Sequence, residues 1–147
     1  MFDHKTWVIA GDGCLMEGIS HEAISIAGHL KLNKLIVIFD DNKISIDGPT
    51  ELTCSDNQKK RFEASNWNVL EINGHDFKSI EKGLKLSTKS KKPTLVICKT
   101  LIGYGSPNKS GTESSHGAPL GEDEALLTKK NLDWSYPKFF IPKFIKN

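Results

Sequence analysis

The chain has 147 residues, of which 26% are charged and 37% hydrophobic, and its formal net charge is +2. A chain of this length fits one domain with a sizeable core. So small a net charge gives no reason to expect binding to nucleic acid or to a membrane surface. The three cysteines form no CxxC pair, so neither a zinc site nor a disulfide framework is indicated. No signal peptide or membrane span is visible, and we therefore expect a cytoplasmic protein.

A buried strand is predicted at residues 6–10, where an apolar run leads into Gly11-Asp12-Gly13. After Gly18, apolar residues recur at helical spacing, at Ile19, Ala23, Ile26, Ala27 and Leu30. A strand, a glycine turn and a helix in this order hold a diphosphate in α/β folds. Gly13 would let the backbone approach a phosphate closely, because glycine has no Cβ.

A second buried strand is predicted at residues 35–39, and it leads into Asp41-Asn42-Lys43-Ile44. If the two strands lie parallel, their carboxyl ends bring Asp12 and Asn42 to one edge of the sheet. A carboxylate oxygen, an amide oxygen and a backbone carbonyl just beyond Asn42 would suit Mg²⁺ or Ca²⁺, with phosphate and water completing the shell. The alternative is an ordinary tight turn with Asp12 as a helix cap, and spacing alone leaves both open.

The middle of the chain alternates helical and strand patterns. A helix capped by Ser55 is predicted through residues 59–64, then a strand near residues 67–72. Asp76 is expected to cap the next helix, whose buried stripe begins with Phe77 and Ile80, and residues 94–99 form a further strand. This alternation favours an α/β fold, a three-layer αβα sandwich with a mostly parallel sheet.

The last third of the chain contains a long loop and an aromatic tail. Residues 103–112 are glycine-rich and cannot form a core element, and loops of this length are commonly functional or disordered. His116 follows this loop; by residue type alone it is a surface histidine, although it can donate to a phosphate or transfer a proton near neutral pH. A short helix with acidic residues in its first turn is predicted from Gly121. Residues 134–145 are strongly apolar and would form an exposed aromatic surface on a free chain.

Five long strings of the sequence resemble the transketolase family. They are GDGCLMEGISHEA, LIVIFDDNKISIDG, KRFEASNWNVLEINGHD, PTLVICKTLIGYGSPNKSGT and HGAPLG. The resemblance as a whole covers nearly the entire chain, from about Asp3 to Pro142. Gly-Asp-Gly followed roughly thirty residues later by Asn is the thiamine-diphosphate fingerprint. The resemblance implies that residues 1–147 are a partial diphosphate-binding domain, incomplete at its N-terminus, with 134–147 leading into an interdomain linker.

The resemblance also implies roles for individual residues. Asp12 and Asn42 would ligate Mg²⁺, Ca²⁺ or another divalent cation through their side chains, and Ile44 through its carbonyl. Thiamine diphosphate would be contacted by Gly13, Asn42, Ile46 and His116. Ile46 would pack on the cofactor ring; the alternative is a loop residue anchored to the core. Glu17 would lie at a subunit interface.

His116 is also the residue implied to be catalytic and to bind substrate. The reaction implied is the thiamine-diphosphate-dependent transfer of a two-carbon ketol unit from a ketose phosphate to an aldose phosphate, in the pentose phosphate pathway. The family's enzymes are homodimers. In many relatives another histidine lies in the stretch before His116, where this chain has Glu113-Ser114-Ser115, which leaves substrate preference open.

The family pattern places further active-site residues outside these 147. Transketolases have a long segment before this region, and the glutamate that activates the aminopyrimidine ring belongs to a second domain. We therefore expect the isolated chain to have no transketolase activity. The alternatives are a subunit of a split transketolase, a related thiamine enzyme such as dihydroxyacetone synthase or deoxyxylulose-phosphate synthase, and a non-enzymatic remnant that binds cofactor or dimerises.

Overall fold

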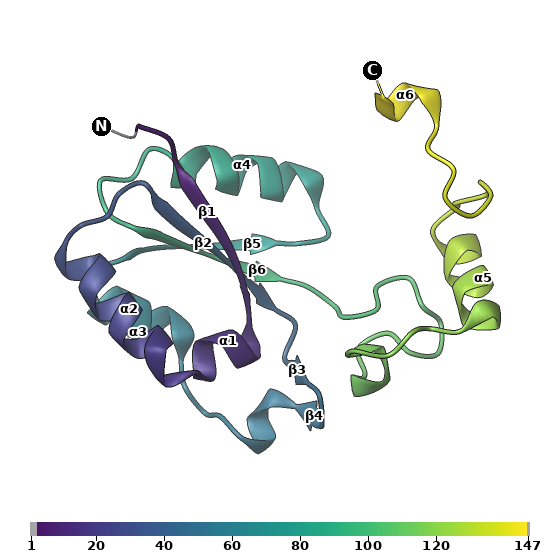
Figure 1. Cartoon of the computed structure of the whole chain (residues 1–147), viewed down its shortest axis with the longest axis horizontal. Helices are drawn as coiled ribbons and strands as arrows, with labels where there is room; N and C mark the ends of the chain where they lie inside the picture. The colour runs from purple at the N-terminus through teal and green to yellow at the C-terminus, as the bar shows by residue number, and fades with distance from the viewer. Residues whose placement is uncertain (1–2, 147) are drawn as a thin grey trace.

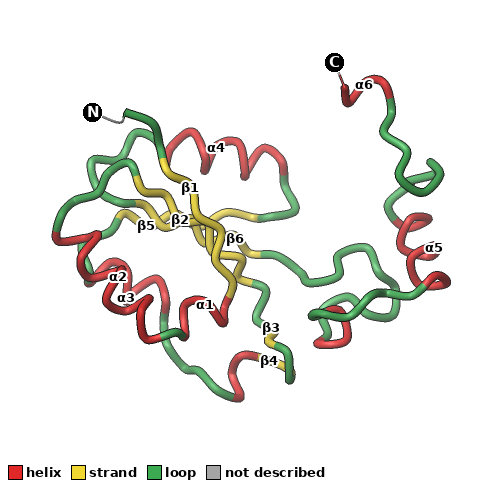
Figure 2. Tube along the Cα trace, in the orientation of Figure 1, coloured by secondary structure: helices red, strands yellow, loops and turns green. Residues whose placement is uncertain are grey.

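A four-stranded parallel sheet forms the centre of the computed structural model, which describes residues 3–146 (Figure 1). In spatial order its strands are β1 (Thr6–Gly11), β2 (Leu35–Asp41), β6 (Thr94–Lys99) and β5 (Asn68–Asn73). One face is covered by α1 (Asp12–Met16), α2 (Gly18–His29) and α3 (Gln58–Ala64), and the other by α4 (Phe77–Ser87) (Figure 2). The predicted three-layer α/β architecture is confirmed.

Side chains alternate between the two faces of the sheet because successive residues of a strand point in opposite directions. On β2, Val37 and Phe39 belong to the core beneath α1–α3, whereas Ile36 belongs to the core beneath α4. Phe62 of α3 packs edge-on against Trp67, with ring centroids 5.0 Å apart. These two apolar layers hold the parallel strands in register, and therefore fix which strand ends are neighbours.

The outer strand and its helix are more exposed than the sequence predicts. Trp7, Val8 and Ile9 are 43%, 40% and 79% exposed, since within residues 3–146 β1 pairs only with β2 and forms the edge of the sheet. In α2 the buried residues are Ile24, Ala27 and Gly28, and the apolar residues Ile19, Ile26 and Leu30 are exposed. The prediction that the strand at residues 6–10 is buried is therefore wrong. Most of the apolar residues that recur at helical spacing in α2 are also exposed, contrary to the prediction of a helix with a buried apolar face.

Helix caps follow local chemistry in one case and differ in another. Asp76 caps α4 as predicted and accepts a hydrogen bond from the Lys78 N–H at 2.9 Å. The cap of α3 is Asn57, which accepts from the Lys60 N–H at 2.9 Å, and not Ser55. Both residue types satisfy a free N–H at a helix start, so the sequence offers two possible caps within three residues. Phe77, predicted to be buried, is 88% exposed.

The remaining elements lie beyond the carboxyl ends of the strands. β3 (Ile44–Ser45) and β4 (Gly48–Pro49) form a small hairpin, followed by η1 (Thr50–Leu52). After β6, a long loop leads through η2 (Glu113–Ser115) to α5 (Glu122–Asn131) and α6 (Lys143–Lys146), which extend away from the sheet (Figure 1). Among the described helices none is long and apolar enough to cross a membrane.

Candidate metal and diphosphate site

The parallel pairing of β1 with β2 brings Asp12 beside the segment that follows β2. Gly11 is the register partner of Asp40, so Asp12 and Asp41 come next on the two chains. The charges of Asp41, Lys43 and Asp40 lie close enough to affect the pKa of the Asp12 carboxyl, and α1 packs against β2 and β3. The predicted meeting of the two polar segments at one edge of the sheet is therefore found.

The Asp12 carboxylate has one oxygen buried without a partner. Its Oδ2 atom is inaccessible to solvent and receives no hydrogen bond from the described residues. Burial, and next the nearby Asp41 carboxylate, raise the pKa of Asp12 above its ordinary value. Leaving a buried acceptor unsatisfied costs on the order of 1–3 kcal/mol. A divalent cation at Oδ2 would remove this penalty, so the surroundings of Asp12 fit a metal ligand.

Asn42 is held by neighbours that sequence reasoning did not identify. Its Nδ2 donates to Asp40 Oδ2 at 3.2 Å, and its Oδ1 accepts from the Ile44 N–H at 2.9 Å. The Thr100 hydroxyl donates to the other oxygen of Asp40. An amide oxygen has two lone pairs, so Asn42 Oδ1 keeps one for a cation. Asp40 lies near the end of β2, and Thr100 directly follows the neighbouring strand β6. This shared position at strand ends is the only feature of the sequence that could have predicted their contact.

The Ile44 carbonyl is free of the hairpin ladder. In an antiparallel pair, hydrogen-bonded residue pairs alternate with pairs that exchange no hydrogen bonds. The Thr50 N–H donates to the Lys43 carbonyl at 2.9 Å, and Pro49, which lies opposite Ile44, has no N–H to donate. The carbonyl of Ile44 therefore receives no hydrogen bond from β4 and remains available as an oxygen ligand.

These donors form a partial set. No group of three or more His, Cys, Asp or Glu residues within the described range 3–146 could hold a metal. The possible protein ligands are one carboxylate, one amide and one carbonyl, all of them hard oxygen donors. Such a set suits Mg²⁺ or Ca²⁺ when phosphate oxygens and water complete the coordination shell. The number and type of these donors thus favour a cation that is bound together with a phosphorylated ligand.

Three other predicted residues, Gly13, Ile46 and Glu17, are exposed in the segments that follow β1 and β2. Gly13 in α1 is exposed, and a Cβ at this position would meet no atom of the protein within 4 Å. Ile46 occupies the tip of the β3–β4 hairpin and is 67% exposed, so it is not anchored in the core. Glu17 is exposed between α1 and α2. Open space at Gly13 and an exposed apolar side chain at Ile46 are what a bulky ligand would require.

His116 is exposed and follows η2, where its N–H donates to the Glu113 carbonyl at 2.8 Å. The loop that carries it leaves the carboxyl end of β6, at the same edge as the ends of β1 and β2 (Figure 1). Within residues 3–146, no hydrogen bond or ion pair joins the His116 side chain to Asp12 or Asn42. The loop that carries His116 therefore begins at the edge of the sheet where the ends of β1 and β2 lie.

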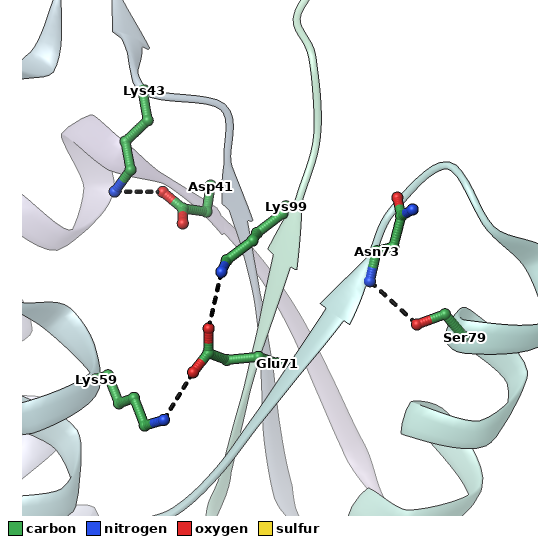
Figure 3. Close-up of polar contacts among 7 residues, drawn as sticks. All are labelled: Asp41, Lys43, Lys59, Glu71, Asn73, Ser79 and Lys99. Carbon is green, nitrogen blue, oxygen red and sulfur yellow. Dashed lines mark hydrogen bonds and ion pairs between the residues drawn. The ribbon is translucent and has the colours of Figure 1, made fainter.

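A charged cluster continues this edge toward β5 (Figure 3). Glu71 forms ion pairs with Lys59 at 2.7 Å and with Lys99 at 3.0 Å. Lys43 Nζ lies 2.7 Å from Asp41 Oδ1, an ion pair without hydrogen-bond geometry. Hydrogen bonds from Lys59 and then Lys99 lower the pKa of Glu71 to about 2. Glu71 is thus the central acceptor that links α3, β5 and β6.

Replacing Glu71 with glutamine is expected to lower the free energy of unfolding at pH 7 by less than about 1 kcal/mol, because the pairs are partly exposed. The pKa of Glu71 is lowered on folding, so its contribution is present above about pH 4.5 and is lost as the pH falls toward 2. Urea unfolding at pH 7 and pH 3 measures this difference. Glu81→Gln, which removes a single exposed ion pair with Lys85 in α4, is the control. An equal loss for Glu71→Gln at both pH values would contradict the assignment.

The whole chain is similar to known proteins of one family. Residues 1–147 match the family model described as transketolase, thiamine diphosphate binding domain. A transketolase of Buchnera aphidicola subsp. Baizongia pistaciae is 59% identical over 143 residues, which are 96% of this chain and 22% of the relative. Transketolase 1 of Escherichia coli is 53% identical over 145 residues, 97% of this chain and 22% of the relative.

Solved structures show the same similarity. A transketolase from Campylobacter jejuni superposes with a TM-score of 0.95 at 46% identity, over 99% of this chain and 23% of that one. A transketolase from Leishmania mexicana gives a TM-score of 0.94 at 40% identity, over 98% and 22% of the two chains. The chain therefore spans about a fifth of the length of the relatives it matches.

Proposed function

The chain belongs to the transketolase family, and on that premise we propose that it forms the metal- and diphosphate-binding part of a thiamine-diphosphate-dependent transketolase. Asp12 and Asn42 hold a divalent cation through their side chains and Ile44 through its carbonyl, with Mg²⁺ as the first choice and Ca²⁺ as another candidate. The observation that carries this proposal is the buried Asp12 Oδ2 without a partner, beside the segment that holds Asn42.

The remaining residues act on the cofactor and the substrate. Thiamine diphosphate, when bound, supplies the stabilisation of a carbanion that ketol transfer requires. The open space at Gly13 accommodates the diphosphate, and the exposed Ile46 offers an apolar surface to the cofactor ring. His116 donates a hydrogen bond to the diphosphate and to the substrate, and an imidazole side chain is able to exchange a proton near neutral pH.

The proposed reaction moves a two-carbon ketol unit from a ketose phosphate to an aldose phosphate. In this proposal residues 1–147 are part of the diphosphate-binding domain, residues 134–147 lead into a linker, and Glu17 lies at the interface of a homodimer or of a complementary subunit. Because the relatives are about five times longer, the complete activity needs residues that this chain does not contain. The isolated chain is therefore expected to bind the cofactor and to catalyse no ketol transfer.

The test places residues 1–147 in the corresponding segment of E. coli transketolase 1, and measures ketol transfer by this chimera and by the isolated chain. We expect activity in the chimera alone. Gly13→Ala should reduce the activity of the chimera about 100-fold, because a methyl group displaces the diphosphate. The thermal midpoint without cofactor should not change, since this methyl meets no protein atom within 4 Å.

Gly18→Ala is the matched control. A Cβ at Gly18 also meets nothing within 4 Å, and Gly18 lies at the start of the next helix, α2. It should leave ketol transfer unchanged. Ketol transfer by the isolated chain, or a folded chimera that binds no thiamine diphosphate, would overturn the proposal.

A further inference from the structure

A nearly buried carboxylate holds the long loop between β6 and α5. Glu124 lies in the first turn of α5 and is only 9% exposed. Its Oε1 atom accepts from the Ser106 hydroxyl and from the Asn108 N–H at 2.8 Å, and its Oε2 atom accepts from Asn108 Nδ2 at 2.8 Å. One carboxylate thus satisfies three donors from two loop residues.

The contacts continue from this carboxylate to the residue before His116. The Ser106 hydroxyl, which donates to Glu124, also accepts from the Lys109 N–H at 3.1 Å. The Lys109 carbonyl in turn accepts from the Ser115 hydroxyl at 2.6 Å. An unbroken path of hydrogen bonds therefore connects Glu124 with the segment in which His116 lies.

Close contacts also hold the two ends of this loop together. Gly103 adopts a φ of +63°, and a Cβ there would lie 2.5 Å from Ser115 Oγ, so the two ends of the loop touch. The Gly111 N–H donates to the Ile102 carbonyl at 2.8 Å. From α5, Asn131 Nδ2 donates to the Gly105 carbonyl at 3.1 Å. A segment with few apolar residues is thus ordered by polar contacts within itself and by contacts from Glu124 and Asn131 of α5.

The charge of Glu124 makes these contacts strong. Hydrogen bonds from Asn108, and next from Ser106, lower the pKa of Glu124 to about 2. The carboxylate is therefore ionised at any pH at which the protein would work, and hydrogen bonds to an ionised acceptor are about twice as strong as neutral ones. The neighbouring Glu122 and Asp123 are exposed, so this role belongs to one acid of the three.

We propose that Glu124 is a positioning residue, which through Ser106 and Lys109 fixes the loop that presents His116 to the cofactor and substrate. The inference rests on the proposed function, in which His116 contacts both. If the loop is released, His116 is in place for only part of the time, and the apparent affinity for substrate falls by that fraction. We call the contacts of Glu124 with Ser106 and Asn108 the clamp. Loss of the clamp should therefore raise KM more than it lowers kcat.

The first experiment follows tryptic cleavage of the Lys109–Ser110 bond in the full 147-residue chain. Glu124→Gln removes the charge and one of the two acceptor oxygens, so that the hydrogen bonds that remain are neutral and weaker. Cleavage should be about 10-fold faster because local opening is easier. Combining Glu124→Gln with Asn108→Asp reverses donor and acceptor and should restore protection. Glu122→Gln removes the same charge from an exposed position that pairs with Lys138, and should have no effect.

The second experiment measures KM and kcat of the chimera described above. Glu124→Gln should raise the KM for the ketose phosphate about 10-fold, with kcat within about 3-fold of the unchanged protein, and the double variant should reverse this.

If cleavage at Lys109 is no faster in Glu124→Gln, or is already rapid in the unchanged chain, the clamp is overturned whatever the protein's function. If cleavage is faster and KM is unchanged, the positioning of His116 is overturned. If the unchanged chimera is folded but transfers no ketol unit, the proposed function and the positioning role fail together, and cleavage alone decides the clamp.

Discussion

Replacing Asp12 with asparagine is expected to weaken Mg²⁺-dependent binding of thiamine diphosphate to the chain by at least about 100-fold. Even residues that only orient a metal ligand cost 10–100-fold when removed, and Asp12 is the one carboxylate in the proposed ligand set. Its buried Oδ2 atom has no other partner among the described residues. Calorimetric titration with thiamine diphosphate measures this loss of affinity. It is done once in the presence of Mg²⁺ and once with a chelator instead of Mg²⁺.

The same substitution should make the cofactor-free chain more stable. Because burial and Asp41 raise the pKa of Asp12 in the folded state, the folded protein binds the proton more tightly than the unfolded chain. The stability therefore falls as the pH rises from the ordinary value of 3.8 through the raised pKa. Asp12→Asn removes this cost, and we expect a gain on the order of 1 kcal/mol at pH 7.

Asp47→Asn is the control for both measurements, since Asp47 is exposed at the tip of the β3–β4 hairpin. It should change neither the unfolding free energy nor the binding of the cofactor. Mg²⁺ with thiamine diphosphate at about 100 times the dissociation constant should stabilise the unchanged chain by about 2.7 kcal/mol, and Asp12→Asn by no more than about 0.4 kcal/mol. A less stable Asp12→Asn chain without metal, or binding that survives the substitution, would argue against the site.

Replacing Gly28 with alanine should destabilise the chain by about 3 kcal/mol or more. A Cβ at Gly28 would lie 1.7 Å from the Ser65 carbonyl oxygen and 3.3 Å from the Trp67 ring. The nearest atom belongs to the backbone and cannot rotate away, so α2 would have to move from the loop that follows α3. Alanine is the better helix former by about 1 kcal/mol, but this gain is smaller than the cost of the displacement.

Urea unfolding of Gly28→Ala beside Gly18→Ala tests this packing. Gly18 begins the same helix, and a Cβ there meets nothing within 4 Å, so its substitution should leave the unfolding free energy unchanged or slightly higher. Equal stability of the two variants would show that α2 does not lie directly against Ser65.

The sequence by itself determined the order and type of the main elements, and it predicted which polar residues follow the ends of neighbouring strands. Continuous apolar runs at residues 35–39 and 94–99 could only be covered strands, and the polar residues after them had to meet where parallel strands end. Asp12 and the segment after β2 are indeed neighbours in the structure. These features could be predicted because each depends on residues that are close together in the chain, or on a general rule for parallel sheets.

Only the tertiary structure decided which apolar faces are covered and which polar residues work together. Ile26 and Ala27 are adjacent in α2 and both fit a helical stripe, but only Ala27 is buried, because contact with distant residues selects the face. The pairing of Asp40 with Thr100 crosses 60 residues, and that of Ser106 with Glu124 crosses 18. Periodicity carries no information about such contacts, since their energy arises only when strands and loops far apart in the sequence meet in the folded chain.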